Sequence, residues 1–287
     1  MFLLLIVSLV WAFSFGLIKD QLTGLDSNFV AFSRMVLSLI VFIPFARTKR
    51  ISFSYAGQLI LLGAVQFGLM YVAYIFAYQY LKAYQVALFT IFTPIYISLI
   101  NDLIEERFNY LNLNVAVLAT LGAGIIVITD IGWVKLGIGF ILMQVSNMAF
   151  AFGQVYYRKL MNKFPKVPDT SIFAFLYLGA VLLTGIFSFF TTDYSQLSIS
   201  KNQILILVYL GVLASGVCFF LWNLGARRTE PGILAVFNNL KVPLAIFISL
   251  VFFKESTDMP RLIIGGSLIV VAMIIADGRW IKKMPSL

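Results

Sequence analysis

The stretch AFSFG at residues 12–16 decides the fold, because it recurs as AFAFG at residues 149–153. Further along, LGAVQFG at residues 62–68 is matched by LGVLASG at residues 210–216. Segments that recur in the same order in two parts of a chain are typical of an internal duplication. The opening stretch therefore predicts that the chain consists of two related halves.

The spacing between a proline and a glutamate is also kept in both halves. Pro94 precedes Glu106 by the same number of residues that separates Pro243 from Glu255. This common spacing keeps the two halves in register almost to their ends. The predicted repeats are residues 1–130 and residues 131–287.

The composition places both halves in a membrane. Hydrophobic residues make up 61% of the 287 residues and charged residues 11%, whereas soluble domains have roughly 45–50% and 25%. Apolar runs of about 20 residues, each long enough to cross a bilayer as a helix, recur along the chain. The first run lacks a basic leader and an A-x-A-like cleavage site, so we expect a retained span. We predict an all-α integral membrane protein with ten transmembrane helices at residues 2–19, 28–46, 57–78, 83–103, 112–129, 135–157, 171–191, 203–224, 231–253 and 261–277.

Five spans in each repeat have a topological consequence. Because five is odd, the second repeat enters the membrane from the opposite face, and a pseudo-two-fold axis in the membrane plane relates the halves. Inverted repeats of this kind surround a central cavity near the midplane in alternating-access carriers.

The basic residues predict the orientation. Most of the net charge of +9 comes from short loops between apolar runs, so we interpret it as topology rather than as a nucleic-acid surface. We expect both termini in the cytoplasm and the chain in the cytoplasmic (inner) membrane. The basic residues predicted on the cytoplasmic side are Arg47, Lys49, Arg50, Arg107, Arg158, Lys159, Lys163, Lys166, Arg227, Arg228, Arg279, Lys282 and Lys283.

The composition also excludes several kinds of chemistry. The chain has one cysteine and no histidine, and its twelve acidic residues lie in loops or at the ends of spans. An intrachain disulfide, a Cys/His metal site and histidine catalysis are therefore excluded, and we expect no metal and no cofactor. A membrane-embedded enzyme acting on lipid, or a non-transporting membrane protein, is retained only as a weaker alternative.

Lys241, in the stretch FNNLKVP at residues 237–243, is the main candidate for a binding residue. A lysine near the bilayer centre costs at least about 2.5–3.5 kcal/mol and persists mainly where it faces a wet cavity or a partner. Its side chain is too short to reach headgroups about 15 Å away. The alternatives are a bond to backbone carbonyls freed by Pro243 and a misplaced span boundary. Asn238, three residues earlier, lies on the same helical face.

Other polar residues in the spans are candidates for the same cavity. Gln144 and Asn147 are three residues apart and belong to one polar stripe, for which interhelical hydrogen bonding is the competing interpretation. Arg34 either extends towards the headgroups or lines the outer mouth of the cavity.

Aromatic residues complete the candidate cavity. Tyr74 and Tyr78 share a helical face, Trp222 occupies the position of the second repeat that matches Tyr74, and Trp11 lies at mid-span. Such rings suit a small amphipathic solute, although packing within the bundle explains any single one.

Pro94 and Pro243 occupy equivalent positions of the two repeats, in mid-span. Proline removes a main-chain hydrogen bond, and paired interruptions are typical of transporter binding sites. We predict that they act in gating, with kinking that does not involve ligand contact as the alternative.

The pattern W-A-F-S-F-x3-K from Trp11 to Lys19, Arg34 in the second span, and P-x11-E at the end of the fourth and ninth spans resemble the EamA family of the drug/metabolite transporter (DMT) superfamily. The resemblance covers nearly the whole chain. It implies a secondary transporter, usually an exporter or exchanger of amino acids or related metabolites. Lys241 is not a general feature of that family, so its role is not implied by the resemblance.

We predict secondary transport of a small solute with a carboxylate, such as an amino acid or an organic acid. Lys241 and Asn238 would bind the carboxylate, and Tyr74, Trp222 and Trp11 would enclose the rest. A larger aromatic or nucleoside-containing metabolite, or a drug, is the alternative. Protons or a counter-solute are the expected coupling partners, and the chain is expected to act as a monomer or a homodimer.

Overall fold

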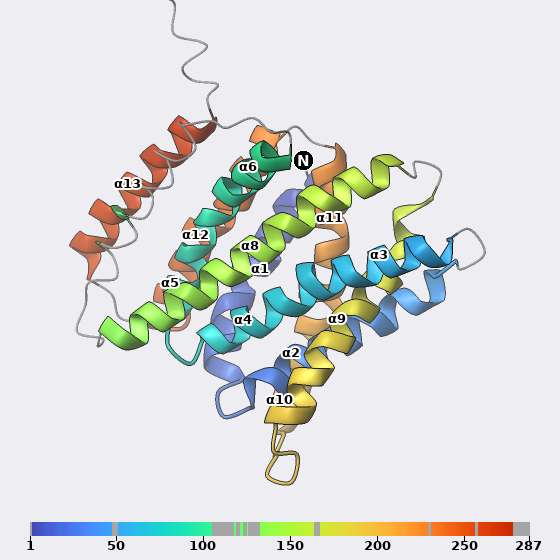
Figure 1. The fold of residues 1–287 in the computed structure, drawn as a ribbon. Coiled ribbons are helices and arrows are strands. Elements are labelled where there is room, and N and C mark those ends of the chain that lie inside the picture. The colour runs from blue at the N-terminus through green and yellow to red at the C-terminus, as the bar shows by residue number, and fades with distance from the viewer. Residues whose placement is uncertain are drawn as a thin grey trace, which may run out of the picture.

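The computed structural model describes residues 2–47, 51–104, 133–163, 167–228, 231–255 and 258–277, together with residues 118, 121, 122 and 125. Regular structure within these ranges is entirely helical (Figure 1). The elements are α1 (Phe2–Gln21), α2 (Ser27–Phe42), η1 (Ile43–Phe45), α3 (Phe53–Gly63), η3 (Ala64–Leu69), α4 (Met70–Ala77), α5 (Ala83–Phe89), η4 (Thr90–Phe92), α6 (Thr93–Ile104), α8 (Trp133–Lys163), α9 (Asp169–Thr191), α10 (Lys201–Val208), η5 (Tyr209–Val217), α11 (Cys218–Arg228), α12 (Pro231–Val251) and α13 (Met259–Asp277).

The helices have the length and composition of membrane spans. Seven segments within the described ranges are long and apolar enough to cross a bilayer, which confirms the prediction of an all-α membrane protein. Elements α12 and α13 coincide with the predicted ninth and tenth spans. The predicted fifth span, residues 112–129, lies largely outside the described residues, as does Glu106. The seven segments are Leu4–Gln21, Ser27–Phe45, Phe53–Ala77, Ala83–Ile104, Lys135–Lys163, Asp169–Thr191 and Lys201–Arg228.

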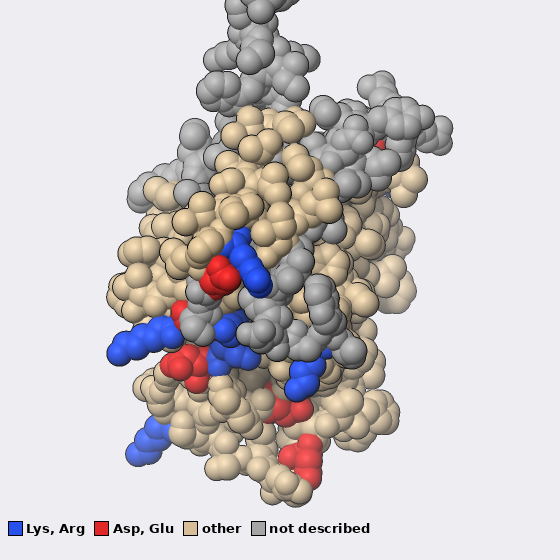
Figure 2. Space-filling model, turned by 90° about the vertical axis from the view of Figure 1, so that its left-hand side faces the viewer, with Lys and Arg blue, Asp and Glu red and all other residues tan. Residues whose placement is uncertain are grey.

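The outer surface of the bundle is apolar, as a lipid-facing surface must be. Large hydrophobic side chains such as Leu61, Phe189 and Ile263 are well exposed. Figure 2 shows a face on which the charged side chains lie in the middle and lower part, below an uncharged described surface. In Figure 1 the start of α1 and the end of α13 lie at the same side of the bundle, opposite the α1–α2 and α9–α10 connections.

Two spans contain a π-helical turn at matching places. In the first, η3 interrupts the helix formed by α3 and α4, and in the second, η5 interrupts the helix formed by α10 and α11. The matched sequences LGAVQFG and LGVLASG lie at these two turns. A π turn widens the helix and is frequent at functional sites.

Glycines allow close helix crossings next to both π turns. A Cβ added to Gly63 of α3 would lie 1.8 Å from the carbonyl oxygen of Leu176 in α9. A Cβ added to Gly211 of η5 would lie 2.7 Å from the side chain of Leu37 in α2. Small residues are typical of such tight packing between membrane helices. The two crossings fix α9 and α2 against the π-containing spans.

The span from Ala83 to Ile104 is divided by the 3-10 turn η4. Asn147 of α8 supports this turn, since its Nδ2 donates to the carbonyl oxygen of Phe89 at 2.7 Å and its Oδ1 accepts from the Thr93 hydroxyl at 3.2 Å. The side-chain amide of Asn147 thereby bonds a main-chain group that has lost its helical partner at the break.

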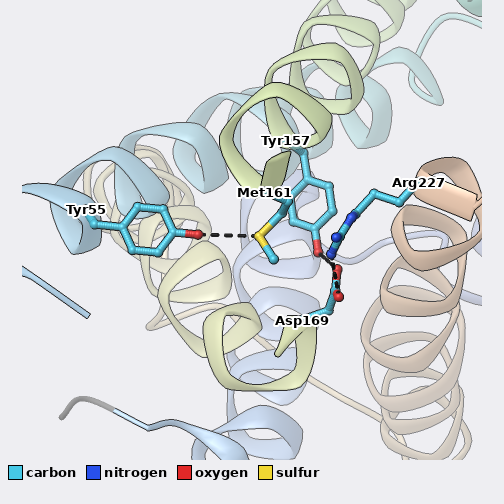
Figure 3. A network of polar contacts seen from close by, with 5 residues as sticks. All are labelled: Tyr55, Tyr157, Met161, Asp169 and Arg227. Carbon is cyan, nitrogen blue, oxygen red and sulfur yellow. Dashed lines mark hydrogen bonds and ion pairs between the residues drawn. The ribbon is translucent and has the colours of Figure 1, made fainter. Parts of the chain in front are cut away.

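A polar cluster joins helices at the end of the bundle where α8 finishes and α9 begins (Figure 3). Arg227 of α11 pairs with Asp169 at 2.7 Å, and the Tyr157 hydroxyl donates to the same carboxylate. The Tyr55 hydroxyl contacts the sulfur of Met161 at 3.4 Å. These contacts hold α3, α8, α9 and α11 together at that end.

Candidate functional site

A cavity of about 70 Å³ lies between the helices. Side chains from α1, α2, α4, α6, α8, α11 and α12 and from the η4 turn contribute to it. The lining residues are Trp11, Ser14, Phe15, Arg34, Met70, Tyr71, Tyr74, Thr90, Thr93, Ser146, Asn147, Phe150, Phe219 and Lys241.

Trp11 forms the centre of the aromatic wall. Its indole Nε1 donates to the carbonyl oxygen of Ala214 in η5 at 2.9 Å, which fixes the ring. Phe219 lies 4.8 Å from the Trp11 ring and Phe150 lies 6.3 Å from it, both measured between centroids. The predicted residue Trp222 packs behind Trp11 at 5.0 Å, fully buried, so its ring supports the wall rather than lining the cavity.

Lys241 projects from α12 into the cavity and is 5% exposed. Its Nζ donates to Oδ1 of Asn238 at 3.1 Å and lies 5.2 Å from the centroid of the Trp11 ring, within cation–π range. The partner is a side-chain oxygen rather than a backbone carbonyl freed by Pro243. The described contacts of Lys241 therefore do not include a bond to such carbonyls.

Arg34 is the second cation of the cavity and is only 2% exposed. Its Nε donates to the Ser215 hydroxyl at 3.1 Å and its Nη2 donates to the Tyr71 hydroxyl at 2.9 Å. The guanidinium carbon also lies 4.7 Å from the centroid of the Tyr71 ring. The alternative in which Arg34 extends towards the headgroups is therefore wrong, because its charge stays inside the bundle.

The two cations are not balanced by acid at the cavity. None of the described residues that line it is an aspartate or a glutamate. Burying an uncompensated charge is costly. The cavity is therefore suited to a solute that brings negative charge.

The structure places the other predicted residues at different distances from the cavity. Tyr74 and Asn147 line it. Tyr78 shares a 2.9 Å hydroxyl–hydroxyl hydrogen bond with Tyr74. Gln144 lies outside the lining and accepts from the Tyr96 hydroxyl at 3.0 Å. Its role in the described contacts is to join α8 to α6.

The prolines differ from the paired kinks that the sequence predicts. Pro94 follows the η4 turn at the start of α6, so the first interruption is present. Pro243 lies inside α12, which continues through it as a helix, and its side chain is exposed. The helix is interrupted beside one proline and not beside the other.

A second, larger cavity of about 650 Å³ opens towards the α1–α2 connection. Tyr78 and Lys19 line it, and the Lys19 Nζ donates to the carbonyl oxygen of Tyr78 at 2.6 Å. Asp193 lies at its rim, where the Ser195 hydroxyl and backbone N–H both donate to the carboxylate and hold its pKa below the usual value. The hydrogen-bonded pair of Tyr74 and Tyr78 thus lies between the two cavities.

A helical membrane bundle around a buried, aromatic, cation-bearing cavity has the architecture of a secondary transporter. A sequence model described as the EamA-like transporter family matches residues 1–128 and 137–276, and the chain belongs to this family. This confirms the resemblance seen in the sequence and the prediction of a transporter rather than an enzyme.

Related proteins match along nearly their whole length. The chain is 38% identical to a protein of Escherichia coli K12 named biotin transporter, over 291 residues that cover 100% of this chain and 95% of the relative. It is 37% identical to a probable biotin transporter of Pseudomonas aeruginosa, over 98% of this chain and 96% of the relative. It is 27% identical to an S-adenosylmethionine/S-adenosylhomocysteine transporter of Chlamydia muridarum, over 89% and 84%.

One known crystal structure has a similar fold. It superposes with a TM-score of 0.68, covers 96% of both chains and is 17% identical in sequence. At this identity the similarity concerns the fold alone.

Proposed function

We propose that the protein transports biotin across the cytoplasmic membrane by alternating access. The observation that carries this proposal is the pairing of two buried cations, Arg34 and Lys241, in an aromatic cavity without a lining acid. Biotin has a carboxylate, an apolar chain and ring, and an uncharged cyclic urea. The names of the relatives from Escherichia coli and Pseudomonas aeruginosa support the same substrate.

The aromatic wall suits the apolar part of such a substrate. Trp11, Phe219 and Phe150 pack against one another with tilted and edge-to-face rings, and Tyr74 brings a ring together with a hydroxyl. Aromatic rings contribute large apolar area, with few rotatable bonds to restrict on binding. The hydroxyls of Thr90 and other lining residues supply polar partners for the urea.

We propose ten transmembrane helices arranged as two inverted five-helix repeats, residues 1–130 and 131–287. The matched π turns η3 and η5 support this arrangement. So do the matched glycine crossings, in which Gly63 contacts α9 and Gly211 contacts α2. A pseudo-two-fold axis predicts that when a span of the first repeat packs against the second repeat, its counterpart in the second repeat packs against the first.

We propose that both termini lie in the cytoplasm. Clusters of basic residues favour the cytoplasmic side of bacterial membrane proteins. The described basic residues near the ends of α2, α8 and α11, at the side of the bundle where α1 begins and α13 ends, are Arg47, Arg158, Lys159, Lys163, Arg227 and Arg228.

Emptying the site would leave two cations without an anion. Loss of the Lys241 proton would remove one charge, because desolvation disfavours the ammonium form. An incoming counter-solute with a carboxylate would neutralise the site instead. Coupling to protons or to a counter-solute is therefore expected, and the protein is expected to act as a monomer or a homodimer.

A nucleoside-containing metabolite is the second candidate, and the Chlamydia muridarum relative supports it. S-adenosylmethionine has one carboxylate, one ammonium and one sulfonium, so its net charge is positive. The two buried cations disfavour a positive solute, because like charges repel strongly in a desolvated site. The site therefore favours biotin over this candidate.

Ligand screening of the purified protein tests the proposal. Biotin, S-adenosylmethionine, amino acids and organic acids would be compared by thermal shift, and each hit would be repeated on Lys241→Ala. We expect biotin to raise the Tm of the native protein and to be accumulated by proteoliposomes. Stabilisation and accumulation of S-adenosylmethionine without any response to biotin would refute the proposal.

A further inference from the structure

Two cations line the cavity from different helices, Arg34 from α2 and Lys241 from α12. At the edge of its ring, Trp11 Nε1 donates to the carbonyl oxygen of Ala214. The next residue, Ser215, accepts a hydrogen bond from Arg34 Nε. On its face the Trp11 ring contacts the Nζ of Lys241. One cavity therefore presents a guanidinium on the side of α2, α4 and η5, and an ammonium on the side of α12.

The guanidinium of Arg34 is fixed in place but incompletely bonded. The Tyr71 and Ser215 hydroxyls hydrogen-bond to each other at 2.7 Å, and Ser215 also donates to the carbonyl oxygen of Leu210 at 2.8 Å. These bonds position the acceptors of Arg34 Nε and Nη2. The third nitrogen, Nη1, is buried and has no partner among the described residues.

A buried N–H without an acceptor is expensive, and more so on a group that cannot lose its charge. Arginine stays protonated in proteins, so the empty site cannot relieve Arg34 by deprotonation. A ligand oxygen with negative charge would complete its hydrogen bonding. The guanidinium is therefore preorganised for an anion.

The ammonium of Lys241 differs from the guanidinium of Arg34, because the ammonium already has a hydrogen-bond acceptor and an aromatic ring beside it. It donates to Asn238 and lies over the Trp11 ring. The Nδ2 of Asn238 is a further buried donor without a partner in the described part of the chain. Two neighbouring donors suit a carbonyl oxygen, which has two lone pairs.

We infer that Arg34 binds the carboxylate of the substrate, whereas Lys241 and Asn238 bind the carbonyl oxygen of its uncharged cyclic urea. This inference rests on the proposed function. It makes Arg34 the residue that determines specificity for the acid, and it gives Lys241 a role that does not depend on the carboxylate.

Two ligands separate these roles, because biotin and biotinamide differ only in the acid group. Dissociation constants would be measured for native protein and for Arg34→Gln and Lys241→Gln. A charge-assisted hydrogen bond corresponds to a preference of about 10- to 100-fold, so we expect native protein to prefer biotin by this factor. In Arg34→Gln the ratio should fall to about one, and in Lys241→Gln it should persist while both ligands bind more weakly.

Arg261→Gln is the matched control, since this exposed arginine pairs with Asp258 on the surface. Neither affinity should change in it. If Arg34→Gln is not recovered folded, Arg34→Met gives the same comparison without adding a polar group to the interior.

Loss of the preference in Lys241→Gln with retention in Arg34→Gln or Arg34→Met would overturn the inference. A native protein that binds biotin and biotinamide equally would also overturn it, with the proposed substrate still standing. A native protein that binds neither would refute the proposed function itself.

Discussion

The fourth and ninth spans share the spacing from proline to glutamate, but they have different backbones and different chemistry. The fourth is divided by η4 before Pro94, whereas α12 continues as a helix through Pro243. Neither proline by itself therefore decides where a span breaks. Asn147 holds the break in the fourth span by bonding Phe89 and the Thr93 hydroxyl. The lesson is that the neighbouring helix, more than the proline, determines the interruption.

The difference extends to the residue two positions before each proline. In the fourth span this residue is Phe92, and in the ninth it is Lys241, and both are buried. Three positions earlier still, Phe89 corresponds to Asn238, the partner of the lysine. At these matching positions the ninth span thus carries a charge, and the fourth span carries a backbone turn.

Single substitutions at Phe92 and Lys241 should have the largest effects. Phe92→Lys buries an ammonium beside Phe89, which offers no side-chain acceptor, at a cost of at least about 2.5–3.5 kcal/mol. We expect little folded protein by size-exclusion chromatography. Lys241→Met removes a buried charge, which is often neutral or stabilising, so the protein should fold. Its biotin uptake should fall by about 10- to 100-fold.

Uptake by proteoliposomes and the Tm without ligand would be measured for both variants. A Phe92→Lys protein as stable as the native one would show that the two positions are equivalent after all. Native uptake by Lys241→Met would contradict the role of the ammonium in the site.

Removing the support of η4 should have the next largest effect. Asn147→Leu keeps the volume but leaves the Phe89 carbonyl oxygen without its donor. Leaving a buried polar group unpaired costs about 1–3 kcal/mol, so the Tm should fall. Met148→Leu in the same helix, where the side chain is 50% exposed, is the control and should be close to native. An unchanged Tm for Asn147→Leu would mean that Pro94 alone maintains the break.

The sequence predicts the features that depend on hydrophobicity and spacing. The membrane class and the burial of Lys241 could be foreseen, because apolar length and the reach of a side chain are local quantities. The rotation of each helix is not local, and it decides that Trp11 lines the cavity while its neighbour Trp222 lies behind it.

Features that depend on partners from distant elements could not be derived from the sequence. Arg34 lies about two turns into its helix, so its side chain could reach either headgroups or the interior. Ser215 and Tyr71, distant in sequence, decide between these positions. The π turns lie beside close crossings with α9 and α2, and the repeated glycines Gly63 and Gly211 were a signal of these crossings.

The smallest of these effects is expected where a residue just after the ninth span meets the start of the fourth span. The carboxylate of Glu255, just after α12, accepts from the backbone N–H of Ala83 at 2.8 Å and of Tyr84 at 3.0 Å, at the start of α5. It therefore acts as a cap for the first turn of the fourth span, supplied by the other half of the chain. Loss of a helix cap costs about 0.5–2 kcal/mol, so Glu255→Ala should lower the Tm modestly, and Glu255→Gln, which keeps an acceptor, should lower it less. Asp258→Asn is the control, because it weakens an exposed ion pair and keeps a side-chain oxygen for the backbone N–H of Arg261. Equal Tm values for all three variants would show that the two spans are held together by their packing alone, without this cap.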